Sequence, residues 1–193
     1  MMQMPSQIHL QAMLVDSFGR PINYLRWAVT DRCNLRCTYC MPNENMVFSP
    51  RSELLSLEEM TSLIEVFEEL GIEKIRITGG EPFMRKDIMK FIERIAESKH
   101  IKSWFITTNG VLMEPFIPQL KALGISGVNL SLDTLEAEKF LKLTKRNDFH
   151  KVWSALESML KNNIKVKINT VIQKGVNDRE LVAMAQLAKT YPV

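Results

Sequence analysis

The feature that most limits the fold of this chain is a repeated alternation of short strand-like runs with longer helical stretches. The strand-like runs are 25–30, 74–78, 103–108, 127–132 and 165–172. The helical stretches are 57–70, 86–97, 115–123, 135–162 with a break near 147–148, and 177–189. Such alternation predicts a parallel sheet with right-handed crossovers. A closed eight-stranded barrel needs roughly 250 residues, so these 193 residues predict an α/β fold, a partial (βα)6 barrel that ends after about five βα units.

Helix-end signals support these boundaries. Ser56 and Glu59 form a capping-box pair, and Gly71 is a typical stop signal. Asn177 with Glu180 predicts a similar start for the last helix. Residues 1–24 show no periodicity and are expected to be an irregular lead-in, followed by the incomplete barrel over 25–193.

The strands alternate aliphatic with polar residues, whereas strands covered on both faces are usually aliphatic throughout. The polar positions are Arg26 and Thr30; Lys74, Arg76 and Thr78; Asn129, Ser131 and Asp133; and Lys165, Lys167 and Asn169. Because successive side chains point to opposite faces, the sheet should turn its aliphatic face to the helices and its polar face to a wet interior cavity.

The cations of this polar face indicate an anionic ligand. Lys74 and Lys165 are at strand starts, where we expect solvated ends. Arg26, Arg76 and Lys167 would face the cavity with few carboxylates to match them, Asp133 and Glu81 at most. Arginine suits bidentate phosphate recognition, and no Walker-type loop is present, so we expect side chains to hold a phosphorylated substrate.

All three cysteines lie in one segment, as Cys33, Cys37 and Cys40. A structural zinc site needs four N or S ligands, and His9, His100 and His150 are distant in sequence. A [4Fe-4S] cluster held by three thiolates leaves one iron open for a substrate. The spacing therefore favours a catalytic cluster, and a non-catalytic zinc-binding module stays open as the alternative.

Composition excludes several classes of protein. The formal charge of +3 and pI near 8.7 are too mild to indicate nucleic acid or membrane binding. The N-terminus lacks a secretory pattern, and no apolar run approaches a spanning helix. A cytoplasmic enzyme is expected, and an odd cysteine count argues against a disulfide framework.

The ends of the predicted strands carry polar and glycine-rich segments. These are Thr30 with the cysteine segment, 79–82, 107–110, 131–133 and 173–175. The carboxyl ends of parallel strands in a barrel form one rim, where active sites are found. The cysteines should therefore face the polar cavity.

The motifs resemble a known family. They are Asp16-x-x-Gly19-Arg20-Pro21-Ile22, Leu25-Arg26, Thr30-Asp31-Arg32-Cys33-Asn34, Tyr39-Cys40-Met41-Pro42, Lys74-Ile75-Arg76-Ile77-Thr78-Gly79-Gly80-Glu81-Pro82, Asn129-Leu130-Ser131-Leu132-Asp133 and Val171-Ile172-Gln173-Lys174-Gly175. The chain resembles the radical S-adenosylmethionine (SAM) superfamily and, within it, the GTP 3′,8-cyclases of molybdenum cofactor biosynthesis.

This resemblance implies a set of site residues. Cys33, Cys37 and Cys40 would hold a [4Fe-4S] cluster. Tyr39, Gly80 and Ser131 would bind SAM. Arg26, Arg76, Thr107 and Lys167 would bind GTP. The reaction would convert GTP to (8S)-3′,8-cyclo-7,8-dihydroguanosine 5′-triphosphate, with no catalytic residue beyond the cluster and SAM.

The resemblance also implies features that the chain lacks. The family has a C-terminal region with a second [4Fe-4S] cluster and a Gly-Gly tail, and neither is present here. An inactive fragment, or another radical SAM enzyme acting on a phosphorylated or nucleotide substrate, is the alternative. Expected partners are a flavodoxin-type reductase system, cyclic pyranopterin monophosphate synthase as the next enzyme, and a second copy in a homodimer.

Overall fold

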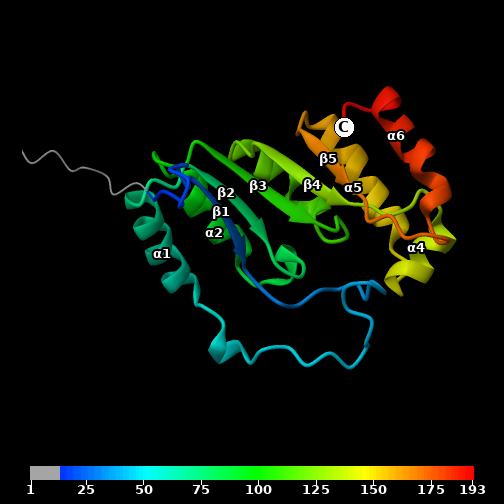
Figure 1. Ribbon diagram of the computed structural model, residues 1–193, viewed down its shortest axis with the longest axis horizontal. Helices are drawn as coiled ribbons and strands as arrows, with labels where there is room; N and C mark the ends of the chain where they lie inside the picture. Colours follow the sequence, from blue (N-terminus) through cyan, green and yellow to red (C-terminus); the bar gives the residue numbers. More distant parts are fainter. Residues whose placement is uncertain (1–13) are drawn as a thin grey trace, which may run out of the picture.

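The computed structural model describes residues 14–193 and contains one five-stranded parallel sheet with strand order β1-β2-β3-β4-β5 (Figure 1). The strands are β1 (Tyr24–Ala28), β2 (Lys74–Thr78), β3 (Ser103–Thr108), β4 (Gly127–Ser131) and β5 (Val166–Asn169). The helices are α1 (Leu57–Glu69), α2 (Ile88–Ala96), α3 (Ile117–Ala122), α4 (Ala137–Thr144), α5 (Phe149–Lys161) and α6 (Leu181–Thr190). The predicted α/β architecture is confirmed.

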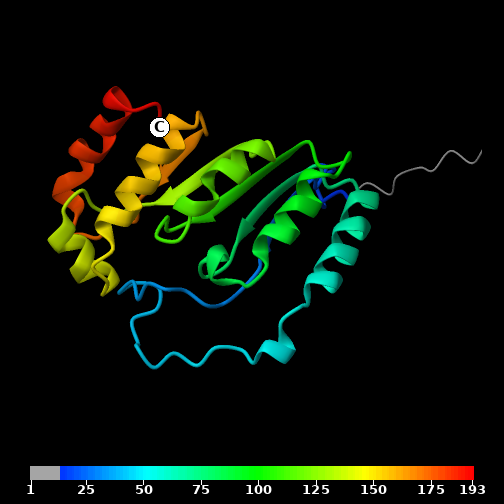
Figure 2. The same ribbon diagram turned by 180° about the vertical axis from the view of Figure 1, so that it is seen from behind.

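The helices pack against one face of the curved sheet, as Figures 1 and 2 show. The strand positions on that face are aliphatic and fully buried, as in Ile75, Ile77, Ile106 and Leu130. The predicted alternation is borne out in β2, where every second residue is buried and the residues between are half-exposed. The other face of the sheet keeps its polar side chains.

Strand β5 is shorter than its sequence pattern predicts. It ends at Asn169, because the next residues turn toward β4: the Thr170 hydroxyl donates to the Leu132 carbonyl at 2.8 Å. The Val171 N–H donates to Asp133 Oδ1 at 2.9 Å. Both bonds fix the exit of β5 against the end of β4.

The helix-end predictions had mixed outcomes. The Ser56–Glu59 capping box is present on α1. Asn177 holds the predicted N-cap position, but its side chain makes no capping bond: it accepts from Gln173 N–H and donates to the carbonyls of Asp133 and Val171. A short 3₁₀ turn, η4 (Asp178–Glu180), therefore precedes α6.

The lead-in is described from residue 14 onward, so the expectation for residues before it, and His9, lie outside the described part. Within the rest, Val15 and Pro21 form an antiparallel bridge around a turn at Gly19, and β1 begins one residue before the predicted start. No helix within residues 14–193 has the length and apolar character needed to cross a membrane.

Candidate functional site

The segment that carries the cysteines leaves the sheet at the end of β1 and crosses the rim. Its first part lies against the turn after β2, where Gly80 N–H donates to the Thr30 carbonyl and Glu81 N–H to the Arg32 carbonyl, each at 2.7 Å. A Cβ on Gly80 would lie 2.2 Å from the Arg32 oxygen. The glycine is therefore required by close backbone contact.

Helix α4 holds the next part of the segment. The N–H groups of Arg36 and Thr38 donate to the carbonyls of Thr144 and Leu143, each at 2.9 Å. Carbonyls in the last turn of a helix have no partner within it, and here the cysteine segment supplies the donors. The same loop is tied to β4 by the Tyr39 hydroxyl, which donates to Asp133 Oδ2 at 2.6 Å.

Arg85 joins the two ends of the excursion that runs from β1 to α1. Its guanidinium donates to the Val29 carbonyl at 2.6 Å, where the excursion begins, and to the Leu55 carbonyl, where it ends. Burial lowers the pKa of Arg85 from its ordinary value. A planar guanidinium can make both bonds in one fixed geometry, which lysine cannot.

The three thiols line one cavity of about 310 Å³. All three cysteines are free of disulfides. Burial raises the pKa of Cys33 and raises that of Cys37 to about 12. A thiol in such surroundings stays protonated unless a metal displaces its proton, since the thiolate is the ligand.

The donors around Cys33 fit an iron–sulfur ligand. Leu35 N–H donates to its sulfur at 3.4 Å and the Asn109 side-chain amide at 3.6 Å, and such hydrogen bonds tune iron–sulfur clusters. Among residues 14–193, no three His, Cys, Asp or Glu side chains are close enough to bind a single metal ion. Each thiolate of a cubane binds a different iron, so its ligands need not converge on one point.

The residues predicted to bind SAM all line the same cavity. Tyr39, Gly80 and Ser131 lie around it with Thr107, which was predicted to bind GTP. An adjoining cavity of about 650 Å³ shares Cys33, Cys40 and Gly80 with it and is lined by Arg26 as well. Five of the seven predicted ligand-binding residues therefore surround the thiols.

Arg76 and Lys167 line neither cavity, but they occupy the same sheet face. Arg26 lies opposite Arg76 in the register, and Thr107 and Lys167 both lie opposite Asn129. Arg76 Nε donates to the Tyr24 hydroxyl at 2.7 Å, and its guanidinium lies 5.0 Å from the centre of the Phe105 ring. One terminal nitrogen of Arg76 is buried without a hydrogen-bond partner.

Two expectations for charged residues need correction. Lys74 is only half-exposed at its strand start, and its ammonium also lies 4.9 Å from the Tyr24 ring centre and 5.0 Å from that of Phe105. Glu81 does not face the cavity as a counter-charge, since it is fully buried. It accepts from Thr108 Oγ1 at 2.8 Å and from the N–H groups of Asn109 and Phe83 at 2.7 and 3.3 Å.

Residues that the sequence reasoning missed are mainly those that position others. Asn109 donates to the Cys33 sulfur and to Asn34 Oδ1 at 2.8 Å. Its place directly after β3, in the segment 107–110, was the available signal. Arg85 and Tyr24 carried no comparable signal in the sequence. Arg85 binds backbone carbonyls, and Tyr24 binds Arg76 of the neighbouring strand.

The sheet, the rim and the three-thiol loop together define a class of enzyme. The sequence profile of the radical SAM superfamily matches residues 27–188, and the chain belongs to that superfamily. A GTP 3′,8-cyclase of Desulforamulus reducens is 44% identical over 181 residues, covering 93% of this chain and 56% of the relative. A GTP 3′,8-cyclase of Campylobacter jejuni is 46% identical over 178 residues, covering 92% of this chain and 56% of the relative.

A longer relative is the molybdenum cofactor biosynthesis protein moc-5 of Caenorhabditis elegans. It is 43% identical over 174 residues, which cover 90% of this chain and 29% of that protein. The chain thus spans little more than half of its bacterial relatives. Among solved structures, anSMEcpe with bound AdoMet has a TM-score of 0.69 at 24% identity, covering 87% of this chain and 49% of that one. Streptococcus suis SuiB bound to S-adenosylmethionine has a TM-score of 0.69 at 21% identity, covering 86% and 38%. Both support the fold alone.

Proposed function

We propose that this chain carries the SAM-binding part of a GTP 3′,8-cyclase, the radical SAM lyase that converts GTP to (8S)-3′,8-cyclo-7,8-dihydroguanosine 5′-triphosphate in the first step of molybdenum cofactor biosynthesis. The observation that carries the proposal is that Cys33, Cys37 and Cys40 line one cavity at the carboxyl ends of the strands. Relatives named GTP 3′,8-cyclase are 44–46% identical across nearly the whole chain.

Each group of residues has a separate role in this proposal. The three cysteines hold a [4Fe-4S] cluster, and Tyr39, Gly80 and the Ser131 hydroxyl position SAM beside it. When bound, the cluster and SAM would supply radical chemistry directed at C3′ of GTP. The chain's own contribution is to hold C3′ in place and exclude water.

The polar face supports an anionic nucleotide as substrate. Arg26, Arg76, Thr107 and Lys167 are the proposed GTP-binding residues. One terminal nitrogen of Arg76 is buried without a hydrogen-bond partner, which is rare for such a group. Arg76 also lies over Phe105, and Tyr24 fixes its orientation.

The partners and the location in the cell are further parts of the proposal. By resemblance, the electron donor is a flavodoxin-type reductase system, and the product passes to cyclic pyranopterin monophosphate synthase. A homodimer and a cytoplasmic location complete it. The family's second cluster would need cysteines beyond the three in this sequence, so we expect GTP turnover to require more than these 193 residues.

The test is anaerobic reconstitution, followed by measurement of iron, sulfide and zinc. We expect about four irons per chain and little zinc. After dithionite reduction, incubation with SAM should yield 5′-deoxyadenosine, measured by mass-resolved chromatography with and without GTP. Cys37→Ala should abolish it, while Thr38→Ala, a change at an exposed neighbour, should not.

Each outcome has a definite meaning. Zinc in place of iron would overturn the cluster assignment. Four bound irons without 5′-deoxyadenosine would show that this chain is inactive alone. Deoxyadenosine formation that does not depend on Cys37 would contradict the proposed site.

A further inference from the structure

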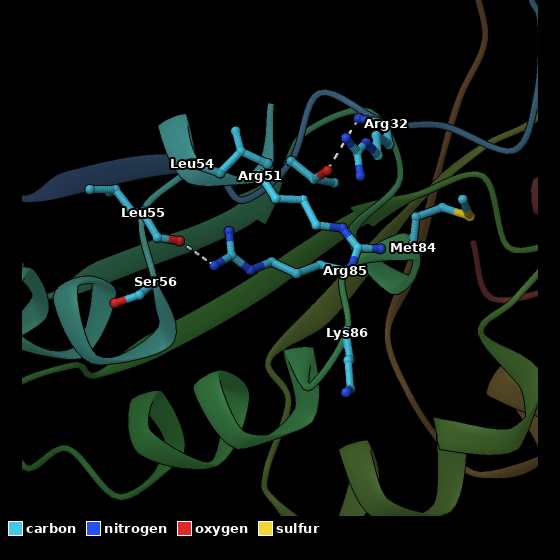
Figure 3. A pocket seen from close by; sticks show the side chains of 9 residues that line it. Arg32, Arg51, Leu54, Leu55, Ser56, Met84, Arg85 and Lys86 are labelled. Atoms are coloured by element: carbon cyan, nitrogen blue, oxygen red, sulfur yellow. Dashed lines mark hydrogen bonds between the residues drawn. The ribbon is translucent and has the colours of Figure 1, made fainter. Parts of the chain in front are cut away.

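A second cavity lies outside the thiol-lined site, between the end of the cysteine-bearing excursion and the turn after η2 (Pro82–Met84) (Figure 3). Its volume is about 260 Å³. Its lining residues are Thr30, Arg32, Arg51, Leu54, Leu55, Ser56, Met84, Arg85 and Lys86. Four of the nine are cations and none is a carboxylate, so we call it the cationic pocket.

The positive charge of the cationic pocket is not balanced by ion pairs. Ten ion pairs occur elsewhere among residues 14–193, but none involves Arg32, Arg51, Arg85 or Lys86. Like charges gathered in one concave site repel one another and raise the local positive potential. An anion in the pocket would remove that repulsion.

No carboxylate lines the pocket, and three of those near it in sequence make contacts with other groups. Asp31 accepts from Ser49 N–H at 2.7 Å. Glu59 accepts from Ser56 N–H at 2.7 Å as part of the capping box. Asp87 pairs with Lys90 at 3.5 Å.

Two of the cations are fixed and two are free to turn. Arg85 is held by the carbonyls of Val29 and Leu55, and Arg32 donates to the Ser49 carbonyl at 3.2 Å. Arg51 and Lys86 are exposed, and their side chains make no hydrogen bond within the described part of the chain. Figure 3 shows Arg51 and Arg85 extending across the pocket.

From these observations we propose that the cationic pocket is a binding site for a small oxyanion of the phosphate class. Guanidinium groups suit phosphate because their N–H donors match its oxygens. Helix α1 begins beside the pocket at Ser56, but Glu58 and Glu59 in its first turn offset the positive end of its dipole, so the attraction comes from the cationic side chains. The volume accommodates phosphate or pyrophosphate and is small for a whole nucleotide.

The cationic pocket is distinct from the proposed GTP site. None of Arg26, Arg76, Thr107 and Lys167 lines it, and it shares only Thr30 and Leu54 with the cavity that Arg26 lines. Two sources of the bound group are nevertheless conceivable: a free anion, or a phosphate of a nucleotide that reaches in from that cavity. The experiment separates them.

The experiment titrates the apo chain with inorganic pyrophosphate by isothermal calorimetry, with sodium chloride of matched ionic strength as the reference. We expect saturable binding, weakened about tenfold in Arg51→Met and again in Lys86→Met, because each charged hydrogen bond removed is worth about 1.4 kcal/mol or more. Lys161→Met removes the same charge from an exposed site on α5 and should bind like the unaltered chain. Circular dichroism checks that all variants fold.

Three results would overturn the proposal. They are the absence of saturable binding at millimolar pyrophosphate, an equal effect of chloride, and a loss of binding in Arg76→Met with none in Arg51→Met. Pyrophosphate binding that survives Arg76→Met supports a site for the free anion. If GTP, but not guanosine, competes with pyrophosphate in both the unaltered chain and Arg76→Met, the pocket accepts nucleotide phosphates as well.

Discussion

Two buried glutamates, Glu81 and Glu180, accept hydrogen bonds from neighbouring loops at the rim. Only Glu180 has a cation among its partners. Glu81, beside the thiols, accepts only from neutral donors on Thr108, Asn109 and Phe83. Glu180, at the far end of the sheet, accepts from Thr134 Oγ1 at 2.8 Å and from Leu135 N–H at 2.8 Å. It also pairs with the ammonium of Lys139 at 2.5 Å.

The pKa values of the two carboxyls follow this difference. Burial raises the pKa of Glu81 to about 7, against an ordinary value of 4.5. Burial also acts to raise the pKa of Glu180, but the hydrogen bonds from Lys139, Leu135 and Thr134 outweigh it and leave the pKa lowered. Both carboxylates thus join two loops, but Glu81 does so without a cationic partner and Glu180 does so with one.

The largest effect should come from removing each carboxylate. Glu81→Ala leaves three donors in a fully buried site and should lower the free energy of unfolding by about 4 kcal/mol. Glu180→Ala should cost about 2 kcal/mol, because Lys139 can turn to water. Chemical denaturation measures both, and Glu69→Ala, at an exposed position, should change stability by less than about 0.5 kcal/mol. Equal losses at the two sites would contradict the comparison.

The pH dependence should have opposite signs at the two sites. The folded-state pKa of Glu81, about 7, lies above the ordinary 4.5, so the stability from its protonated form is complete below pH 4.5 and lost as pH rises through 7. That change amounts to at most about 3 kcal/mol. Glu180 has a lowered pKa, so its contribution is complete above pH 4.5 and is lost as pH falls through its folded-state pKa.

These slopes can be isolated with glutamine variants. Glu81→Gln should flatten the stability profile between pH 4.5 and 7, and Glu180→Gln should flatten it only on the acid side. Denaturant midpoints across this pH range measure how the free energy of unfolding changes with pH. This comparison holds even if the variants differ in absolute stability. A Glu81→Gln profile parallel to that of the unaltered chain would show that Glu81 is not the titrating group.

A smaller effect tests whether the cation alone makes the difference. Lys139→Met should make Glu180 resemble Glu81: its carboxyl should titrate at a higher pH, and stability above that pH should fall by less than in Glu180→Ala. Lys142→Met, in the same helix and exposed, is the matched control. Carboxyl chemical shifts from NMR report the titration directly, and an unchanged Glu180 titration would refute the role of Lys139.

The smallest effect on stability is expected at an exposed glutamate–arginine pair. Glu44, in the cysteine-bearing excursion, takes two hydrogen bonds from Arg146, at 3.1 and 2.9 Å. Exposed pairs contribute little and are screened by salt. Arg146→Met should therefore shift the thermal midpoint only slightly, and the shift should vanish at high salt; a large, salt-independent shift would mean that this pair acts like the buried ones.

The fold followed from local patterns because those patterns express short-range physics. The alternation in β2 predicted which residues are buried, and the Ser56–Glu59 pair predicted the start of α1. The thiol site followed from topology, since parallel strands bring their carboxyl ends to one rim. The residues predicted to bind SAM lie around that rim, whereas most of those predicted to bind GTP lie on the polar face of the sheet, and their roles stay predictions.

The remainder could not be predicted because it depends on partners far away in sequence. Asn177 matched a helix-cap pattern, but Asp133 and Val171 bind its side chain in the folded chain. Lys74 was expected in solvent because the rings of Tyr24 and Phe105 that cover it come from two other strands. Arg85 binds backbone carbonyls. Because every residue has a carbonyl, the sequence does not indicate which ones Arg85 binds.

The contact between the cysteine segment and the end of α4 also bears on the order of events during synthesis. Tyr39, in the same cysteine segment, also bonds Asp133, which follows β4 and lies 94 residues further along the chain. Contacts over such separations form late, after the intervening strands have paired. A ribosome that has released only the cysteine loop therefore exposes three thiols without their supports, and the cavity that they line can form only once α4 has emerged and folded.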